Sequence, residues 1–340
     1  MRGKTDMPDG HRFFAHDHAA HCESGVVSLM LRHHGLPLSE AMVFGLAGAL
    51  MFAYLPMIKL GGMPLIAYRS RPRSIIRGIC SNLGIDMEMK TFRRADAGMR
   101  ALDELLASGE IVGAQTSVYW LPYFPEEMRF HFNAHNLIIY DREDDDFLIS
   151  DPVFEHPVRC PAADLAKARF ARGLMAPRGL LYYPKKIPAT VDYQTIVPKV
   201  IRKNATVMLK SPVPFAGVRA IRALARHIGR LGKKDARHAS LFLGHIVRMQ
   251  EEIGTGGAGF RFIYASFLQE AGEQLGRDDY NEISTMLTEV GDKWRAFAIL
   301  LVKAIRNPSP ETTDFSAIRA SLEDVANDEA AVYRALLETG

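Results

Sequence analysis

The sequence is poor in cysteine and has no uninterrupted apolar run of the length that a membrane helix needs. Only three of the 340 residues are cysteine, and an odd, sparse set argues against a disulfide framework and indicates a reducing, cytoplasmic setting. The longest apolar stretch, residues 41–60, is interrupted by two glycines, a proline and a lysine. It therefore predicts a buried core helix and not a membrane span.

The first residues also lack the apolar segment of a secretory signal, because Lys4, Asp6 and Asp9 occur where that segment would lie. A chain of 340 residues exceeds one ordinary core, and 48% hydrophobic with 24% charged residues is typical of a globular protein. The sequence therefore predicts two domains, residues 1–184 and residues 185–340.

The periodicity of the first half predicts helices followed by strands. Its helical patterns cover residues 26–34, 73–83 and 93–108, and a further helix opens at Ser39-Glu40. Its strand patterns cover residues 111–117, 135–140, 147–150 and 179–183. After residue 184 the patterns are amphipathic helices, at residues 218–231, 238–253, 260–275 and 283–305. We therefore expect an α+β domain followed by an all-α helical domain.

Basic residues are concentrated in one segment of the second half. The net charge is only +3, but residues 185–249 contain fourteen Lys and Arg against two acidic residues. Such a block indicates a surface for an acidic partner, for which nucleic acid, an anionic membrane and an acidic carrier protein are candidates. A solvated, Arg-rich helix face without a partner explains the pattern equally well. The candidate docking residues are Arg222, Arg226, Arg230, Lys233 and Lys234.

Cys22 lies where a polar lead-in changes to an apolar helical pattern, in the run His21-Cys22-Glu23-Ser24-Gly25. This position predicts the first turn of a helix, where unpaired backbone N–H groups and the helix dipole stabilise an anion. A thiolate is stabilised at such a place and can act as a nucleophile. The alternative is a small buried residue without a chemical role, which is common for a free cysteine.

His135 and Asp151 supply a candidate base and orienting group for this thiol. They flank two strand-like runs joined by a short acidic turn, which predicts a β-hairpin. A turn centred near Glu143 makes the two residues direct cross-strand neighbours, and one centred on Asp144 makes them diagonal neighbours on one face. An acid beside an imidazole fixes its orientation and stabilises the imidazolium. A bulge would change this register, and the alternative reading is an ordinary Asp-Pro turn.

The polar lead-in also contains residue types that bind zinc, namely His16, Asp17, His18 and His21 before Cys22. A structural zinc site needs four ligands at defined spacing. So many ligands within seven residues at a helix start give poor geometry for one ion. We therefore expect no metal at this site.

Several short motifs, taken in order, resemble a known family. The N-terminal half resembles papain-like cysteine peptidases of the bacteriocin-leader-peptidase type, and more closely the butirosin-biosynthesis acyltransferase family. The motifs that carry this resemblance are His21-Cys22-Glu23-Ser24, Leu38-Ser39-Glu40, Phe44-Gly45-Leu46-Ala47-Gly48, His135-Asn136-Leu137-Ile138-Ile139-Tyr140 and Ser150-Asp151-Pro152. The C-terminal half is similar to the helical domain usually found with it. Its motifs are Gly254-Thr255-Gly256-Gly257-Ala258-Gly259-Phe260-Arg261, Tyr264-Ala265-Ser266-Phe267-Leu268 and Trp294-Arg295.

This resemblance implies acyl transfer from a carrier-protein thioester to an amine, in secondary-metabolite biosynthesis. Cys22 would be the nucleophile, His135 the base, Asp151 its orienting partner, and the Cys22 backbone N–H an oxyanion donor. No bound cofactor is implied, because the phosphopantetheine thioester arrives on an acyl carrier protein. The partners are then that carrier and a small amine, with neither nucleic acid nor a membrane involved. The glutamine that papain-like enzymes place before the cysteine is missing. His16, His18, His21 or another segment would have to supply that donor, and Glu23 is a further neighbour of the site.

Two other functions share these residues. A papain-like peptidase or amidase would admit water to the acyl-enzyme, whereas a transferase must exclude it. A papain-like fold could also serve as a non-catalytic binding module. The acyl group, the acceptor amine and the oligomeric state, including a homodimer, are left open by the sequence.

Overall fold

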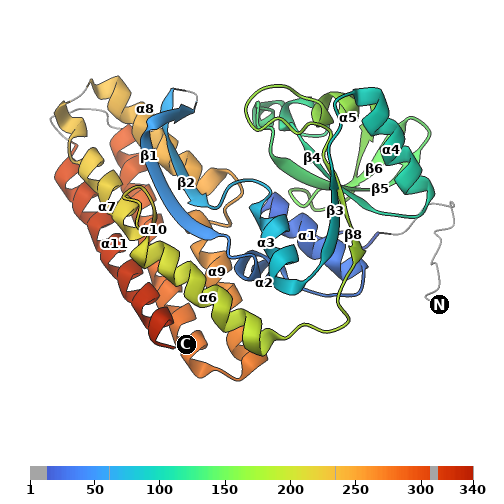
Figure 1. Cartoon of the computed structure of the whole chain (residues 1–340). Helices are drawn as coiled ribbons and strands as arrows, with labels where there is room; N and C mark the ends of the chain where they lie inside the picture. Colours follow the sequence, from blue (N-terminus) through green and yellow to red (C-terminus); the bar gives the residue numbers. More distant parts are fainter. Residues whose placement is uncertain (1–13, 61, 234, 307–312, 340) are drawn as a thin grey trace. The chain divides into compact units, whose positions relative to one another are not determined.

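The computed structural model describes residues 14–60, 62–233, 235–306 and 313–339 (Figure 1). The residues on which the absence of a secretory signal was argued lie outside these ranges. Two compact units are present. The sheet unit comprises the residues up to Val43 together with Ile75–Val191, and the helical unit comprises Phe44–Ser74 together with the residues from Asp192 onward.

The division into units differs from the predicted boundary at residue 184, because a segment of the first half belongs to the helical unit. The expectation of one core helix over residues 41–60 is wrong. A short helix α2 (Glu40–Leu46) ends before Gly48, whose φ of 67° interrupts the helical path. An antiparallel pair then follows, β1 (Leu50–Leu60) with β2 (Met63–Arg69). Burial along β2 alternates from residue to residue, which is the period of a strand.

Aromatic packing holds this hairpin within the helical unit. The Phe52 ring of β1 lies 5.1 Å from that of Tyr68 on β2 and 5.9 Å from that of Trp294, measured between centroids. All three side chains are almost completely buried. The Phe52–Tyr68 contact is edge-on, and the Phe52–Trp294 rings are tilted. Aromatic contacts add about 1 kcal/mol each to the burial of their surface.

The core of the sheet unit is a six-stranded antiparallel sheet in the order β3-β8-β4-β5-β6-β7. Helix α1 (Cys22–His33) packs against β4 and β5 on one face, and α4 (Ala95–Ala107) and α5 (Ala162–Arg169) pack on the other (Figure 1). A further helix, α3 (Ser74–Leu83), directly precedes β3 in the chain. The strands are β3 (Asp86–Lys90), β4 (Val112–Thr116), β5 (His135–Glu143), β6 (Asp146–Ser150), β7 (Val158–Pro161) and β8 (Leu181–Lys186). Predicted strands and helices of this half are confirmed, whereas β3, β7 and α5 were not predicted.

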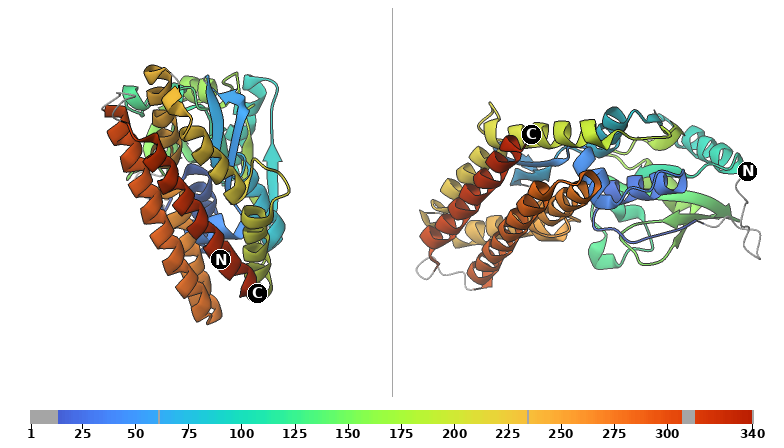
Figure 2. Two further views of the ribbon diagram at one scale, coloured as in Figure 1. Left: turned by 90° about the vertical axis from the view of Figure 1, so that its left-hand side faces the viewer. Right: turned by 90° about the horizontal axis from the view of Figure 1, so that it is seen from below.

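The helical unit confirms the expected all-α second half. Its helices in chain order are α6 (Tyr193–Lys210), α7 (Gly217–Ile228), α8 (Ala236–Val247), α9 (Arg261–Leu275), α10 (Asp278–Arg306) and α11 (Phe315–Glu338). The two longest, α10 and α11, lie side by side (Figure 2). Helices α6 and α11 were not predicted. In the ranges that the structure describes, no helix has the length and apolarity to cross a membrane.

The glycine-rich motif connects α8 to α9 as a tight turn. A π-helical turn, Arg248–Glu252, precedes it, and a 3₁₀ turn, Ala258–Phe260, ends it. Gly259 has φ of 57°, and a Cβ there would lie 2.0 Å from the Tyr68 ring. Only glycine therefore fits at this position.

A buried ion pair follows directly from this turn. Arg261 donates from Nε and Nη2 to the two carboxylate oxygens of Glu329, at 2.7 and 3.1 Å, and both residues are fully buried. The Trp294 indole N–H donates to the same carboxylate at 2.7 Å. Burial lowers the pKa of Arg261, but the Glu329 charge and its hydrogen bond, together with Tyr333 and Tyr68, outweigh it and raise the pKa. Motif residues that are far apart in sequence thus meet at one carboxylate.

Glu329→Gln is expected to destabilise the protein by about 3–5 kcal/mol, because it leaves a buried guanidinium without its counter-charge. Urea unfolding followed by circular dichroism measures this. The matched control is Glu323→Gln, which removes the exposed partner of Arg319 and should cost about 0.5 kcal/mol or less. Equal losses for the two variants would contradict the importance assigned to the buried pair.

Candidate active site

Cys22 is the first residue of α1, as the sequence predicts. His21 before it has an extended backbone and caps the helix, since its Nδ1 accepts the Ser24 N–H at 3.3 Å. Within the described residues, no hydrogen bond occupies the Cys22 backbone N–H. A free N–H at a helix start is suited to stabilising negative charge on a bound group.

The Glu40 carboxylate fixes the backbone just before Cys22. It accepts the Ala20 N–H at 2.9 Å, the His21 N–H at 2.8 Å and the Ser24 hydroxyl at 2.9 Å. Burial raises the pKa of Glu40, and these hydrogen bonds partly oppose the rise. The sequence analysis identified Glu40 only as the start of a helix. The local pattern does not show from which distant N–H groups a carboxylate accepts hydrogen bonds.

His135 and Asp151 form a buried hydrogen-bonded pair. His135 Nε2 donates to Asp151 Oδ2 at 2.7 Å, and neither side chain is more than 4% exposed. The same oxygen accepts the Tyr123 hydroxyl at 2.9 Å, and Oδ1 accepts the Val153 N–H at 3.1 Å. Tyr123 was not identified from the sequence, because it lies in the long connection between β4 and β5. The carboxylate is thus held by three donors.

The pairing register of β5 and β6 selects one of the two predicted arrangements. Ile138 pairs with Ser150, so His135 and Asp151 are diagonal neighbours on one face; the direct pairing is wrong. Closer to the turn the register is different, since Arg142 pairs with Phe147, and the change occurs between Ile139 and Asp141. Had the turn register continued, His135 and Asp151 would lie on opposite faces. An irregularity in β5 therefore brings the pair together.

The Cys22 thiol is close enough to His135 to contribute to the pKa of the imidazole. Because Asp151 occupies Nε2, the ring nitrogen left for the thiol is Nδ1. Burial alone would lower the pKa of His135, but the Asp151 charge and its hydrogen bond, together with the Cys22 thiol, outweigh it and raise the pKa to about 10. The arrangement thus favours an imidazolium next to the thiol at neutral pH. It can deliver a proton to a leaving group and take one from an incoming nucleophile.

The other neighbours proposed from the sequence have partners of their own. His16 Nε2 donates to the Phe154 carbonyl at 2.9 Å, and its Nδ1 lies 2.7 Å from the Ser150 hydroxyl. The Ala19 N–H donates to the Pro152 carbonyl at 2.9 Å. These bonds fasten the lead-in of Cys22 to the segment that carries Asp151, so His16 has a positioning contact in place of the expected oxyanion contact.

Glu23 and Asp17 likewise have partners away from the thiol. Glu23 is fully buried, and its Oε1 accepts the N–H groups of Ile75 and Ile76 at the start of α3, at 3.0 and 3.3 Å. Asp17 pairs with Arg32 at 3.2 Å. Among the described residues, no three His, Cys, Asp or Glu side chains group as a metal site.

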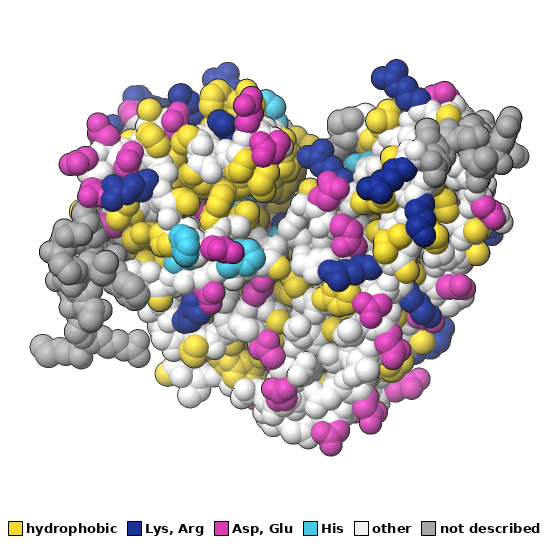
Figure 3. Space-filling view, turned by 180° about the vertical axis from the view of Figure 1, so that it is seen from behind, with side chains coloured by type: hydrophobic (Ala, Val, Ile, Leu, Met, Phe, Trp, Pro, Cys, Tyr) yellow, Lys and Arg dark blue, Asp and Glu magenta, His cyan; other side chains and the backbone are white. Residues whose placement is uncertain are grey.

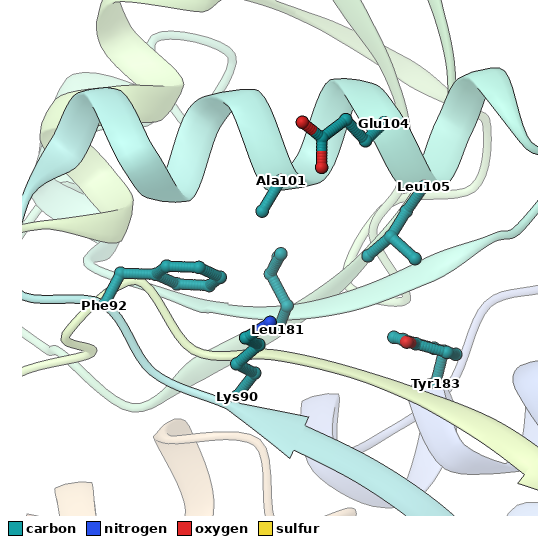
Figure 4. Close-up of a pocket in the computed structure, with 7 residues that line it drawn as sticks. All are labelled: Lys90, Phe92, Ala101, Glu104, Leu105, Leu181 and Tyr183. Carbon is teal, nitrogen blue, oxygen red and sulfur yellow. The ribbon is translucent and has the colours of Figure 1, made fainter.

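A separate hollow of about 170 Å³ lies between α4 and strands β3 and β8 of the sheet unit (Figure 4). It is lined by Lys90, Phe92, Ala101, Glu104, Leu105, Leu181 and Tyr183. None of the residues discussed above lines it. Its volume is also below the roughly 300 Å³ at which small-molecule pockets begin.

Comparison with known proteins places the chain in a family. Residues 163–336, just over half of the chain, match the model of a domain of unknown function, DUF4872. The chain belongs to the DUF4872 family. Residues 21–152 match the model for the N-terminal domain of butirosin biosynthesis protein H. This match agrees with the resemblance to the butirosin family noted from the sequence, and the matched residues include Cys22, His135 and Asp151.

One solved structure similar to this DUF4872 protein is described as a C39-like peptidase from Bacillus anthracis. It is 14% identical, with a TM-score of 0.34, and the match covers 49% of this chain and 90% of that one. No curated protein matches the chain significantly.

The basic residues proposed as a docking surface lie on and after α7 of this DUF4872 protein. Arg226 and Arg230 are exposed, and no acidic side chain of the described residues pairs with either. Arg222 is half-buried and donates to Asn327 Oδ1 at 3.0 Å, so its guanidinium is partly used within the unit. The Lys233 side chain and Lys234 lie outside the described part of the chain.

The raised pKa of His135 predicts a specific pH dependence of stability. The comparison uses Cys22→Ala, which removes the titration of the thiol, with and without His135→Gln. The folded state favours the imidazolium, so its contribution is complete below pH 6.5 and is lost as pH rises toward the folded pKa. In that window the free energy of unfolding of Cys22→Ala should fall by about 1.4 kcal/mol per pH unit relative to the double variant. Parallel urea-unfolding curves across this range would contradict the coupling between His135 and Asp151.

Proposed function

We propose that this protein is a cysteine-dependent acyltransferase that moves an acyl group from an acyl carrier protein thioester to an amine, in secondary-metabolite biosynthesis. The observation that carries the proposal is the buried hydrogen bond between His135 and Asp151, with the Cys22 thiol close to His135 and at a helix start. The match of this region to the butirosin family model supports it.

In the first half-reaction the Cys22 thiolate attacks the thioester carbonyl carbon. A bond forms from Cys22 Sγ to that carbon, and the bond from the carbon to the pantetheine sulfur breaks. His135, as the imidazolium, gives its proton to the departing thiolate, which leaves as a free thiol. The Cys22 backbone N–H stabilises the oxyanion of the tetrahedral intermediate. The phosphopantetheine arm is part of the substrate, so the mechanism needs no resident cofactor or metal.

In the second half-reaction the acceptor amine attacks the Cys22 acyl-enzyme. A carbon–nitrogen bond forms, the carbon–sulfur bond to Cys22 breaks, and His135 takes a proton from the amine. The imidazolium and thiolate are thereby restored. Asp151 keeps the imidazole oriented through both steps, with Tyr123 and Val153 holding Asp151 in turn. Water in place of the amine would give a hydrolase instead.

The acyl-enzyme is the direct test. The protein is mixed with a panel of acyl carrier protein thioesters without an acceptor, and its intact mass is measured. We expect an added acyl mass in the wild type and none in Cys22→Ala, because the bond forms at Cys22 Sγ. Cys160→Ala is the matched control, since that thiol is also buried and should leave the adduct unchanged.

The other outcomes separate the competing functions. Release of pantetheine thiol and free acid without an amine indicates a hydrolase, such as a peptidase or amidase. Neither adduct nor released thiol with any donor contradicts acyl transfer from a carrier thioester and favours a peptidase or a non-catalytic binding module.

The carrier protein is proposed to dock on the basic surface that includes Arg226 and Arg230. Exposed arginines without acidic neighbours attract an acidic protein, and salt screens that attraction. The double variant Arg226→Ala/Arg230→Ala should lower kcat/KM for the carrier-bound donor by about tenfold at low salt and leave a free pantetheine thioester unaffected. Lys303→Ala on α10 is the control for an exposed cation elsewhere. Equal rates for the double variant and the control would place the dock somewhere else.

A further inference from the structure

The exposed apolar side chains of the sheet unit are confined to two loops. All of its large hydrophobic residues that are exposed, among the described residues, lie in the connection from β4 to β5 or in the loop before β8. Figure 3 shows hydrophobic side chains gathered on the surface of this unit. We call this set the apolar rim, and it comprises Tyr119, Trp120, Met128, Phe130, Leu174 and Met175. Exposed apolar patches of this kind mark binding surfaces.

The apolar rim lies at the end of the sheet that carries His135. Thr116, the last residue of β4, pairs with His135, and Val118 donates its N–H to the Phe132 carbonyl at 3.1 Å. The second loop is attached at the same place, because Asn133 Nδ2 donates to the Leu174 carbonyl at 2.9 Å. Phe132 precedes His135 by three residues through a turn at Asn133-Ala134, so their Cα atoms lie at most about 10 Å apart.

Specific contacts order the apolar rim. The Tyr119 ring stacks on His131 with centroids 4.0 Å apart, and the Lys167 ammonium lies 5.7 Å from the centroid of the Trp120 ring. In the second loop Met175 has φ of 55°, which is a strained conformation for a residue with a side chain. Leu174 beside it is 62% exposed.

Two buried polar atoms beside the apolar rim have no partner within the described residues. They are the Ser117 hydroxyl and Asn133 Oδ1, in side chains that are 0% and 5% exposed. Buried polar atoms are normally hydrogen-bonded, so these two are exceptions within the segment that carries most of the apolar rim.

We propose that the apolar rim binds the acyl chain of the donor thioester, and that the chain transferred is therefore apolar, either aliphatic or aromatic. The inference rests on the proposed function, since it names the acyl class of that reaction. An acyl chain is favoured over a protein surface because the group that must reach the thiol is the acyl carbon, and the β4–β5 connection that carries most of the apolar rim ends at His135. A chain of this kind buries apolar surface when it binds, which favours longer chains.

The apolar rim contains its own spectroscopic reporter. The sequence has two tryptophans, and Trp294 is fully buried whereas Trp120 is 39% exposed. Unreactive pantetheine amides carrying acetyl, hexanoyl and decanoyl chains are titrated into Cys22→Ala. We expect a blue shift of tryptophan emission, with affinity rising about threefold to fourfold per added methylene until the rim is covered.

Variants identify the surface that gives this selectivity. Leu174→Ser should remove most of the dependence on chain length while keeping the Trp120 reporter. Leu241→Ser in α8, where the leucine is 53% exposed, is the matched control and should change nothing. Equal affinity for acetyl and decanoyl amides, or an unchanged dependence in Leu174→Ser, would overturn the proposal. A blue shift produced only by an intact carrier protein would also overturn it, because the rim would then be a protein-docking surface.

The experiments can contradict the apolar-rim proposal and the proposed acyltransferase function independently of each other. Binding that depends on chain length without any Cys22 adduct would retain the apolar rim and reject the acyltransferase. Adducts that form at equal rates from acetyl and decanoyl thioesters would retain the acyltransferase and reject the apolar rim.

Discussion

The hydrogen bond from His135 to Asp151 is the interaction on which the other features of the sheet unit depend. A fully buried carboxylate must have its oxygens satisfied, and Asp151 achieves this with three donors from different segments. Those segments are the start of β5, the β4–β5 connection and the turn after β6. The long connection that carries Tyr123 is therefore fixed beside the site, and the apolar rim is presented from the same connection. One charge thus organises the base and the surface that surrounds it.

Two further carboxylates, the buried Glu23 and the half-buried Glu40, fix the cysteine helix. Glu23 binds the first N–H groups of α3, and Glu40 binds the N–H groups that precede α1. Anions at helix starts are favourable because the helix dipole is positive there. In both cases the acid also ties α1 or its lead-in to another element. Together with the contact between His16 and the Asp151 segment, they set the position of Cys22 from three sides.

The sequence was sufficient for the fold class and for the residues of the candidate triad, because each has a local signature. Cys22 follows a polar lead-in, and His135 and Asp151 border one hairpin. The register could not be derived, since the strand irregularity next to Tyr140 has no local signal and one residue of slip exchanges the two faces. Tyr123 and Glu40 were missed because their partners are distant in sequence. The segment 41–60 was misread because apolar residues alone do not distinguish a helix from a buried strand.

The interleaved units have a consequence for how the chain is made and divided. The β1–β2 hairpin leaves the ribosome long before Trp294, on which its Phe52 ring packs. The aromatic face of the hairpin therefore stays uncovered until most of the chain has been synthesised. Contacts between residues so far apart in sequence also form slowly. The two regions matched by family models are consecutive in sequence, but a single cut between them would leave that hairpin on the wrong fragment. The β1–β2 hairpin thus lies in the region matched by one family model but packs in the helical unit, most of which is matched by the other.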